Sequence, residues 1–318
     1  MEVITVLLVL VSLFIGWNIG ANDSANCMGT SVGAGILNYK KAALLVGIFA
    51  LAGAFLQGGN TISTVGKGIV DPVSLGSIAV ISALLAAAVF VSISTYKGIP
   101  VSTTQAVIGA IAAVAVAVQA TVNWGLIGKM FLYWLISPFL ALILSYIAYL
   151  ILDKSLRRYS FMIIDKLIYV LVLGSGIFLA YSLGANNVGN AMGLVVSSDI
   201  MTPVIAGLLG GLFIAFGSIS FGKNVMKTVS NGIMALDARM AFAAQLGGGI
   251  TVYLLTALAI PTSTSHAIIG GIAGVGLVKG VASINKKEVK RVVKGWIVTP
   301  LLSAVVAVII FFILKTIL

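Results

Sequence analysis

Residues 20–26 read Gly-Ala-Asn-Asp-Ser-Ala-Asn, and residues 184–190 read Gly-Ala-Asn-Asn-Val-Gly-Asn, at an offset of 164 positions. Residues 100–106 read Pro-Val-Ser-Thr-Thr-Gln-Ala, and residues 261–267 read Pro-Thr-Ser-Thr-Ser-His-Ala, at an offset of 161. Two further blocks return in the same order: Thr64-Val65 at Thr228-Val229, and Trp134–Pro138 at Trp296–Pro300. Motifs that recur in one order at nearly one spacing indicate a duplicated chain. We therefore divide the sequence into two halves, 1–160 and 161–318.

The composition places the chain in a lipid bilayer. Of the 318 residues, 60% are hydrophobic and 8% are charged, and the mean hydropathy is +1.17. A soluble domain usually carries roughly 25% charged residues. The apolar residues form long continuous runs, which favour helices over the alternating strands of a membrane barrel. The clearest runs are 3–19, 42–57, 76–96, 101–119, 126–151, 167–183, 204–221, 240–260, 264–280 and 296–314. We predict an all-α polytopic membrane protein with about 10–12 membrane segments.

The basic residues indicate that the halves have opposite orientations. Cytoplasmic loops are enriched in lysine and arginine. If each half crosses the membrane five times from an external N-terminus, 16 of the 19 basic residues fall inside. The connections 152–166 and 279–295 are the longest basic ones, and we expect them to be cytoplasmic loops. The pattern predicts inverted-topology repeats with interrupted or re-entrant helices, a site near the midplane, and both termini outside a plasma membrane. Whether 101–119 and 264–280 cross fully or dip back stays open.

The asparagine-rich motifs provide candidate cation ligands. Each follows a long apolar helix, and a polar run at membrane depth is tolerated where it lines a cavity or coordinates an ion. We expect the helix to be interrupted there. Amide and carboxylate oxygens suit a hard cation such as Na⁺, and an intramembrane carboxylate is a functional candidate by default. The candidate ligands are Asn22, Asp23, Asn26, Asn186, Asn187 and Asn190.

The serine- and threonine-rich motifs provide a candidate anion site. Each follows a proline and opens an apolar helix, and such helix starts carry free N–H groups and the positive end of the helix dipole. A tetrahedral oxyanion fits two such helix starts that meet across a pseudo-two-fold axis. The candidate anion-binding residues are Ser102, Thr103, Thr104, Gln105, Ser263, Thr264, Ser265 and His266. His266 is the only histidine, and it is either a packing residue or a proton-binding group.

Several function classes are excluded. The net charge of +11 lies between apolar spans, as expected for loop charge, so we expect no nucleic-acid partner. No phosphate-binding loop for ATP is present. Ser265 and His266 are adjacent and point to different faces of a helix, so they form no protease pair. We therefore expect a protein that is not an enzyme and that has no cofactor other than a coupling ion.

The paired motifs resemble those of the PiT family of inorganic phosphate transporters, whose signature reads approximately Gly-Ala/Ser-Asn-Asp-Val-Ala-Asn-Ala once per half. The resemblance covers essentially the whole chain. It implies inorganic phosphate as substrate, coupling to Na⁺ or H⁺, and inverted halves. It also implies that the serines and threonines contact phosphate and that the Asn/Asp motifs contact the cation. The chain departs from the signature at Ser24 and Cys27 and, above all, at Asn187, where the family commonly has a second aspartate.

The leading hypothesis is a secondary transporter that imports phosphate by symport with Na⁺. The alternatives are a symporter of phosphate, metal–phosphate or sulfate that is coupled to protons through His266 or Asp23, and an anion channel. The lipid bilayer is the expected environment, and the family resemblance is compatible with a homodimer.

Overall fold

The chain forms a bundle of helices. The computed structural model describes residues 2–156, 161–280 and 284–317. Among these residues, eight helices are long and apolar enough to cross a membrane. They are α1 Glu2–Gly33, α2 Tyr39–Gln57, α5 Ser77–Tyr96, α7 Trp124–Leu156, α8 Phe161–Ser197, α9 Pro203–Ser220, α11 Ala238–Ala257 and α13 Lys286–Ile317. The shorter helices are α3 Gly59–Ser63, α4 Pro72–Leu75, α6 Thr103–Ala117, α10 Lys223–Lys227 and α12 Thr264–Lys279, with π-helices η1 Thr64–Gly68 and η2 Thr228–Gly232. The predicted all-α polytopic architecture is confirmed.

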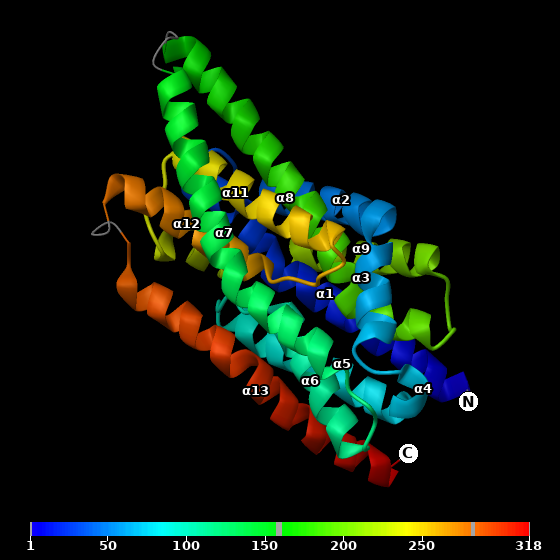
Figure 1. The fold of residues 1–318 in the computed structure, drawn as a ribbon. Helices are drawn as coiled ribbons and strands as arrows, with labels where there is room; N and C mark the ends of the chain where they lie inside the picture. Colours follow the sequence, from blue (N-terminus) through cyan, green and yellow to red (C-terminus); the bar gives the residue numbers. More distant parts are fainter. Residues whose placement is uncertain (1, 157–160, 281–283, 318) are drawn as a thin grey trace.

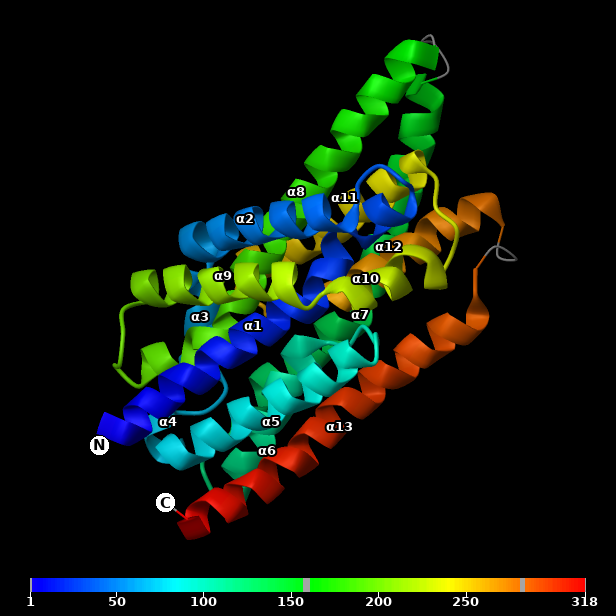
Figure 2. The same ribbon diagram turned by 180° about the vertical axis from the view of Figure 1, so that it is seen from behind.

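The helices of the two halves correspond in order and run in opposite directions. The equivalent pairs are α1 and α8, α2 and α9, α5 and α11, α6 and α12, and α7 and α13. Both termini lie at one end of the bundle; α1 runs away from that end, whereas α8 runs back toward it (Figures 1 and 2). This is the inverted arrangement that the basic residues predict.

The glycine that opens each asparagine motif allows helices of opposite halves to touch. A Cβ on Gly20 would lie 1.8 Å from the carbonyl oxygen of Ile214 on α9, and a Cβ on Gly184 would lie 1.8 Å from that of Ala50 on α2. Small residues let helix backbones approach closely in membrane proteins. The close contacts bury the motifs that follow Gly20 and Gly184 at the centre of the bundle.

The serine and threonine motifs lie at the turns of two helical hairpins, α5–α6 and α11–α12. The ends of each hairpin are held together, because the Asn123 N–H donates to the Ile69 carbonyl at 2.9 Å and the Asn285 N–H donates to the Ile233 carbonyl at 2.8 Å. With 15 residues, α6 is about 22 Å long, which is less than the roughly 30 Å of a hydrocarbon core. The question that the sequence left open is answered by re-entrant helices that begin inside the membrane.

Each re-entrant helix packs against the last long helix of the other half. A Cβ on Gly109 of α6 would lie 2.6 Å from the Pro300 carbonyl oxygen of α13, and a Cβ on Gly270 of α12 would lie 2.1 Å from the Pro138 carbonyl oxygen of α7. Helix α5 also packs on α13, and α11 packs on α7. The bundle therefore contains an α5–α6–α13 group and an α7–α11–α12 group, and each combines elements of both halves.

The two basic connections are more helical than the sequence suggested. Within 152–166, α7 continues to Leu156 and α8 begins at Phe161; residues 157–160, where the halves were divided, lie outside the described residues. Within 279–295, α13 already begins at Lys286. The prediction of two long loops was wrong because these long helices extend past the apolar spans. A small apolar cluster of Leu152, Leu156, Ile168 and Val172 holds the ends of α7 and α8 together.

A first prediction tests the packing of the hairpin on the long helix. Gly270→Ala is expected to lower the thermal stability of the detergent-solubilised protein, because its Cβ would overlap the Pro138 carbonyl on α7. Overpacking of this kind costs about 1–3 kcal/mol. The matched control is Gly128→Ala, whose Cβ would meet no atom within 4 Å. Equal melting temperatures for the two variants would contradict the close contact.

Candidate substrate and cation site

The asparagine motifs lie inside continuous helices. We expected the polar run to interrupt each helix, but α1 continues through residues 22–26 and α8 through residues 186–190. A continuous helix satisfies its own backbone groups, so only the side chains need partners. Residues four apart lie on one helix face, which brings Asn22 and Asn26 together on α1. The interruptions are instead at the hairpin turns.

The first asparagine of each motif holds the hairpin turn of its own half. The Asn22 Oδ1 accepts from the Val101 N–H at 3.1 Å, and its Nδ2 donates to the Thr95 Oγ1 at 2.9 Å. In the other half, the Asn186 Oδ1 accepts from the Thr262 N–H at 3.0 Å. Non-helical backbone at membrane depth needs such partners. Asn22 and Asn186 therefore position the starts of α6 and α12.

Asp23 lies at the centre of the polar cluster. Its Oδ2 accepts from the Thr103 Oγ1 at 2.6 Å and from the Asn187 Nδ2 at 3.3 Å, and its Oδ1 accepts from the Asn26 Nδ2 at 3.2 Å. Only 1% of Asp23 is exposed, and it is the only acidic residue in the buried set of the described chain. Asp23 and Asn187 are equivalent positions of the two halves, so the halves meet directly at this carboxylate.

The two hairpin helices begin beside Asp23. The Ser102 Oγ accepts from the Gln105 N–H at 3.3 Å, and the Ser263 Oγ accepts from the His266 N–H at 3.3 Å, so both serines cap their helices. The Thr104 hydroxyl lies 3.0 Å from the Thr262 carbonyl oxygen of the other half, to which it can donate. The predicted meeting of two helix starts is therefore present in the structure.

Symmetry-related oxygen atoms in the cluster have no hydrogen-bond partner. They are the Oδ1 atoms of Asn26 and Asn190, and both residues are buried. The Asn190 Nδ2 is engaged with the Thr104 Oγ1 at 2.8 Å, and the Asn26 Nδ2 is engaged with Asp23. Buried polar atoms without a partner are rare and call for an explanation such as a bound ion. These two oxygens and the Asp23 carboxylate form a donor set for a hard cation.

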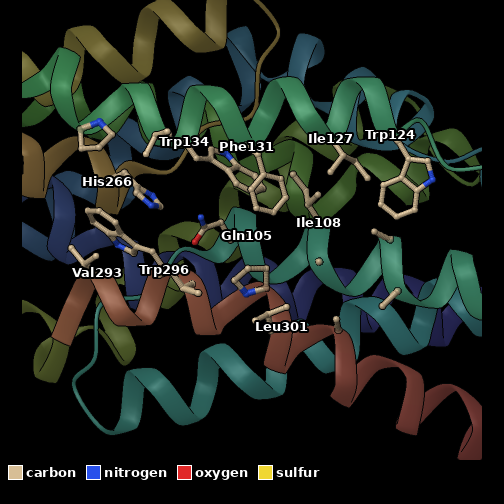
Figure 3. A pocket seen from close by; sticks show the side chains of 18 of the residues that line it. Gln105, Ile108, Trp124, Ile127, Phe131, Trp134, His266, Val293, Trp296 and Leu301 are labelled. Atoms are coloured by element: carbon tan, nitrogen blue, oxygen red, sulfur yellow. The ribbon is translucent and has the colours of Figure 1, made fainter. Parts of the chain in front are cut away.

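Gln105 and His266 occupy a different environment from the other candidates. Their side chains line a cavity between α6, α7 and α13 (Figure 3). The His266 ring stacks on Trp296 with centroids 3.8 Å apart. The Gln105 Oε1 and the His266 Nδ1 have no hydrogen-bond partner. The structure therefore brings the backbone N–H groups of these two residues to the helix starts, whereas their side chains face the cavity.

The sequence interpretation missed three residues that support the site. Thr95 contacts Asn22, and its equivalent Thr256 donates to the Asn186 Oδ1 at 3.2 Å. Trp134 donates from Nε1 to the Pro261 carbonyl at 3.1 Å. The repeat offset of 161 relates Thr95 to Thr256, so the repeat itself contained the signal for the two threonines.

Comparison with known proteins identifies the chain. A family model described as the phosphate transporter family matches residues 19–307. The chain belongs to the phosphate transporter family. A protein of Pyrococcus horikoshii with the name "Putative phosphate permease" is 30% identical over 96% of each chain, and one of Methanocaldococcus jannaschii is 31% identical over 95% of each chain. A solved structure titled "The sodium-dependent phosphate transporter" matches 99% of this chain and 100% of its own, with a TM-score of 0.87 and 27% identity.

These findings confirm the family resemblance and the prediction that the protein is not an enzyme. The family member described here is a multi-pass membrane phosphate permease. Its paired motifs form one central cluster, in which the candidate anion and cation residues contact one another.

Proposed function

We propose that this phosphate permease imports phosphate by symport with Na⁺. The observation that carries the proposal is the meeting of the α6 and α12 starts beside the buried Asp23 carboxylate. Helix starts with Ser and Thr hydroxyls suit a tetrahedral oxyanion. None of the basic residues belongs to the buried set of the described chain, so the anion is held by uncharged donors and can be released. The sodium-dependent title of the matching structure supports Na⁺ as the coupling ion.

The cation is assigned to the oxygen atoms around Asp23. The carboxylate, the unpartnered Oδ1 atoms of Asn26 and Asn190, and the amide of Asn187 supply hard ligands for Na⁺. Asn22 and Asn186 take the role of positioning residues, because their amide oxygens already accept from the hairpin turns. The cation assignment thus narrows to Asp23, Asn26, Asn187 and Asn190.

Coupling follows from a shared hydroxyl group. The Thr103 hydroxyl donates to the Asp23 Oδ2 at 2.6 Å. A cation bound to this carboxylate competes for the same lone pairs and frees the hydroxyl for phosphate. The cation also attracts the anion, and two opposite charges about 4 Å apart gain about 4 kcal/mol at an effective dielectric constant of 20. Na⁺ therefore binds first and prepares the phosphate site.

The orientation in the plasma membrane follows from charge. The connections α1–α2, α7–α8 and α12–α13 lie at the end of the bundle opposite both termini (Figures 1 and 2). Basic residues are concentrated next to these connections, at Lys40, Lys41, Lys154, Lys166, Lys279, Lys286 and Lys287. The positive-inside rule then places both termini outside the cell.

Uptake of radiolabelled phosphate into proteoliposomes tests the function. A Na⁺ gradient alone is expected to drive saturable accumulation, and a pH gradient alone is expected to drive none. Accumulation with a pH gradient alone would establish proton coupling instead, and downhill flux without accumulation would establish a channel. Competition with sulfate in the same assay tests the substrate, and unlabelled sulfate is expected to leave uptake unchanged.

A second prediction concerns the hydroxyl that joins the two helix starts. Thr104→Val is expected to raise the KM for phosphate about 5- to 30-fold, because it removes a hydroxyl that bonds both Asn190 and the Thr262 carbonyl and is worth about 1–2 kcal/mol. Initial uptake rates over a phosphate series measure the change. The control is Ser82→Ala, whose hydroxyl bonds only the Ile78 carbonyl of its own helix. An unchanged KM for Thr104→Val would remove this hydroxyl from the phosphate site.

A further inference from the structure

The cavity beside Gln105 and His266 opens to the surface that faces lipid tails. Its volume is about 1020 Å³, and it separates α7 from α6 and α13, so it lies between the two three-helix groups (Figure 3). Leu135 of α7 and Ile297 and Leu301 of α13 line it and are 63–66% exposed. Large exposed apolar side chains on a membrane-spanning helix face lipid. The volume lies at the upper end of the roughly 300–1,000 Å³ typical of ligand pockets.

The cavity wall on α13 continues into a pair of lysines. Val293 and Ile297 line the cavity, and Lys290 and Lys294 precede them at the three- and four-residue spacing of one helix face. Both lysines are exposed, and no ion pair involves either of them among the described residues. They lie on the first turns of α13, at the end of the bundle opposite the termini. Long lysine side chains near a helix end reach the headgroup layer while their stems stay in the apolar region.

We propose that this cavity, the α7–α13 cavity, binds an anionic phospholipid. The headgroup phosphate contacts Lys290 and Lys294, and one acyl chain enters the apolar space between α7 and the α6–α13 wall. Basic sites next to membrane helices attract anionic headgroups, and the apolar walls exclude phosphate ions from the same space. The bound chain fills the gap between the α5–α6–α13 and α7–α11–α12 groups and thereby stabilises their relative position. This inference does not depend on Na⁺ coupling.

Native mass spectrometry with added lipid tests the headgroup site. The purified full chain is titrated with phosphatidylglycerol and with phosphatidylcholine that has the same acyl chains. The wild type is expected to retain phosphatidylglycerol preferentially. The double variant Lys290→Ala/Lys294→Ala is expected to bind it about thirtyfold more weakly, which corresponds to about 2 kcal/mol for two lysines near a membrane surface. The control Lys40→Ala/Lys41→Ala removes the same charge at the same end of the bundle, away from the cavity, and is expected to bind like the wild type.

A second pair of variants tests the acyl-chain site. Ala304 lines the cavity, whereas Leu302 of the same helix is 47% exposed and does not line it. Ala304→Phe is expected to lower lipid retention, and Leu302→Phe is expected to leave it unchanged. Equal retention of the two lipids, or equal loss in the Lys40/Lys41 control, would overturn the proposal. A dimer that is lost in Ala304→Phe, with lipid retention unchanged, would also overturn it and would assign the cavity to a second copy of the chain.

Discussion

Asp23→Asn is expected to abolish the stimulation of phosphate uptake by Na⁺ while the protein stays folded. The carboxylate is the only buried acidic group of the described residues, and no described ion pair neutralises it. A cation about 4 Å away gains about 4 kcal/mol at an effective dielectric constant of 20. Loss of the charge should therefore weaken Na⁺ binding on the order of 100- to 1,000-fold. The measurement is the initial rate of phosphate uptake over a Na⁺ series at constant ionic strength.

The fold should survive this change because an amide oxygen can still accept the Thr103 hydroxyl. Size-exclusion chromatography and a melting curve check that it does. The matched control is Asp199→Asn, which removes an exposed carboxylate at a position with a positive φ of 56° that asparagine tolerates well. If Asp23→Asn keeps the Na⁺ activation of the wild type, the cation does not bind at this carboxylate.

The sequence predicts the central cluster because the repeat marks it twice. Asn22 and Asn186 occupy one position of the duplicated motif, and both hold a hairpin turn. The Ser102 and Ser263 caps follow from their place before an apolar helix. Motifs that recur at one offset identify which residues are equivalent. They do not show which of the equivalent residues touch each other, since contacts between the halves depend on tertiary packing.

Three features of the fold lay beyond the sequence for this reason. The helices continue through the asparagine motifs because the polar side chains find partners on neighbouring helices, and a single helix cannot reveal those neighbours. The packing of α6 on α13 and of α12 on α7 depends on glycine contacts between distant segments. The side chains of Gln105 and His266 face the α7–α13 cavity although their backbone N–H groups belong to the helix starts, because helix geometry points successive side chains in different directions.

The direct contact between Asp23 and Asn187 gives the second departure from the family signature a physical meaning. From the sequence, an asparagine at position 187 removes a charge from a second cation site. In the structure the Asn187 Nδ2 lies 3.3 Å from the Asp23 Oδ2, so both positions belong to one cluster. An amide at this distance donates a hydrogen bond to the carboxylate, whereas a second carboxylate would repel it. Asn187 thus allows one carboxylate to stay charged in the cluster with fewer cations.

Asn187→Asp is therefore expected to make the protein more dependent on Na⁺. Without Na⁺, the two carboxylates repel each other, and the melting temperature in choline chloride should fall by several degrees. Added NaCl should restore it, because a ligand that binds only the folded state stabilises it by mass action. In proteoliposomes, the activation of uptake by Na⁺ should become steeper, as expected when a further cation is needed to neutralise the second charge.

The comparison with other variants separates charge from packing. Asn187→Ala removes the amide without adding a charge, so it should lower the melting temperature equally in NaCl and in choline chloride. Asn123→Asp adds the same charge at an exposed position where the side chain accepts from the Leu126 N–H, and an aspartate caps that helix equally well. A melting temperature of Asn187→Asp that does not respond to Na⁺ would show that no cation joins the two carboxylates. The meeting point of the two halves would then stabilise the fold without being the coupling site.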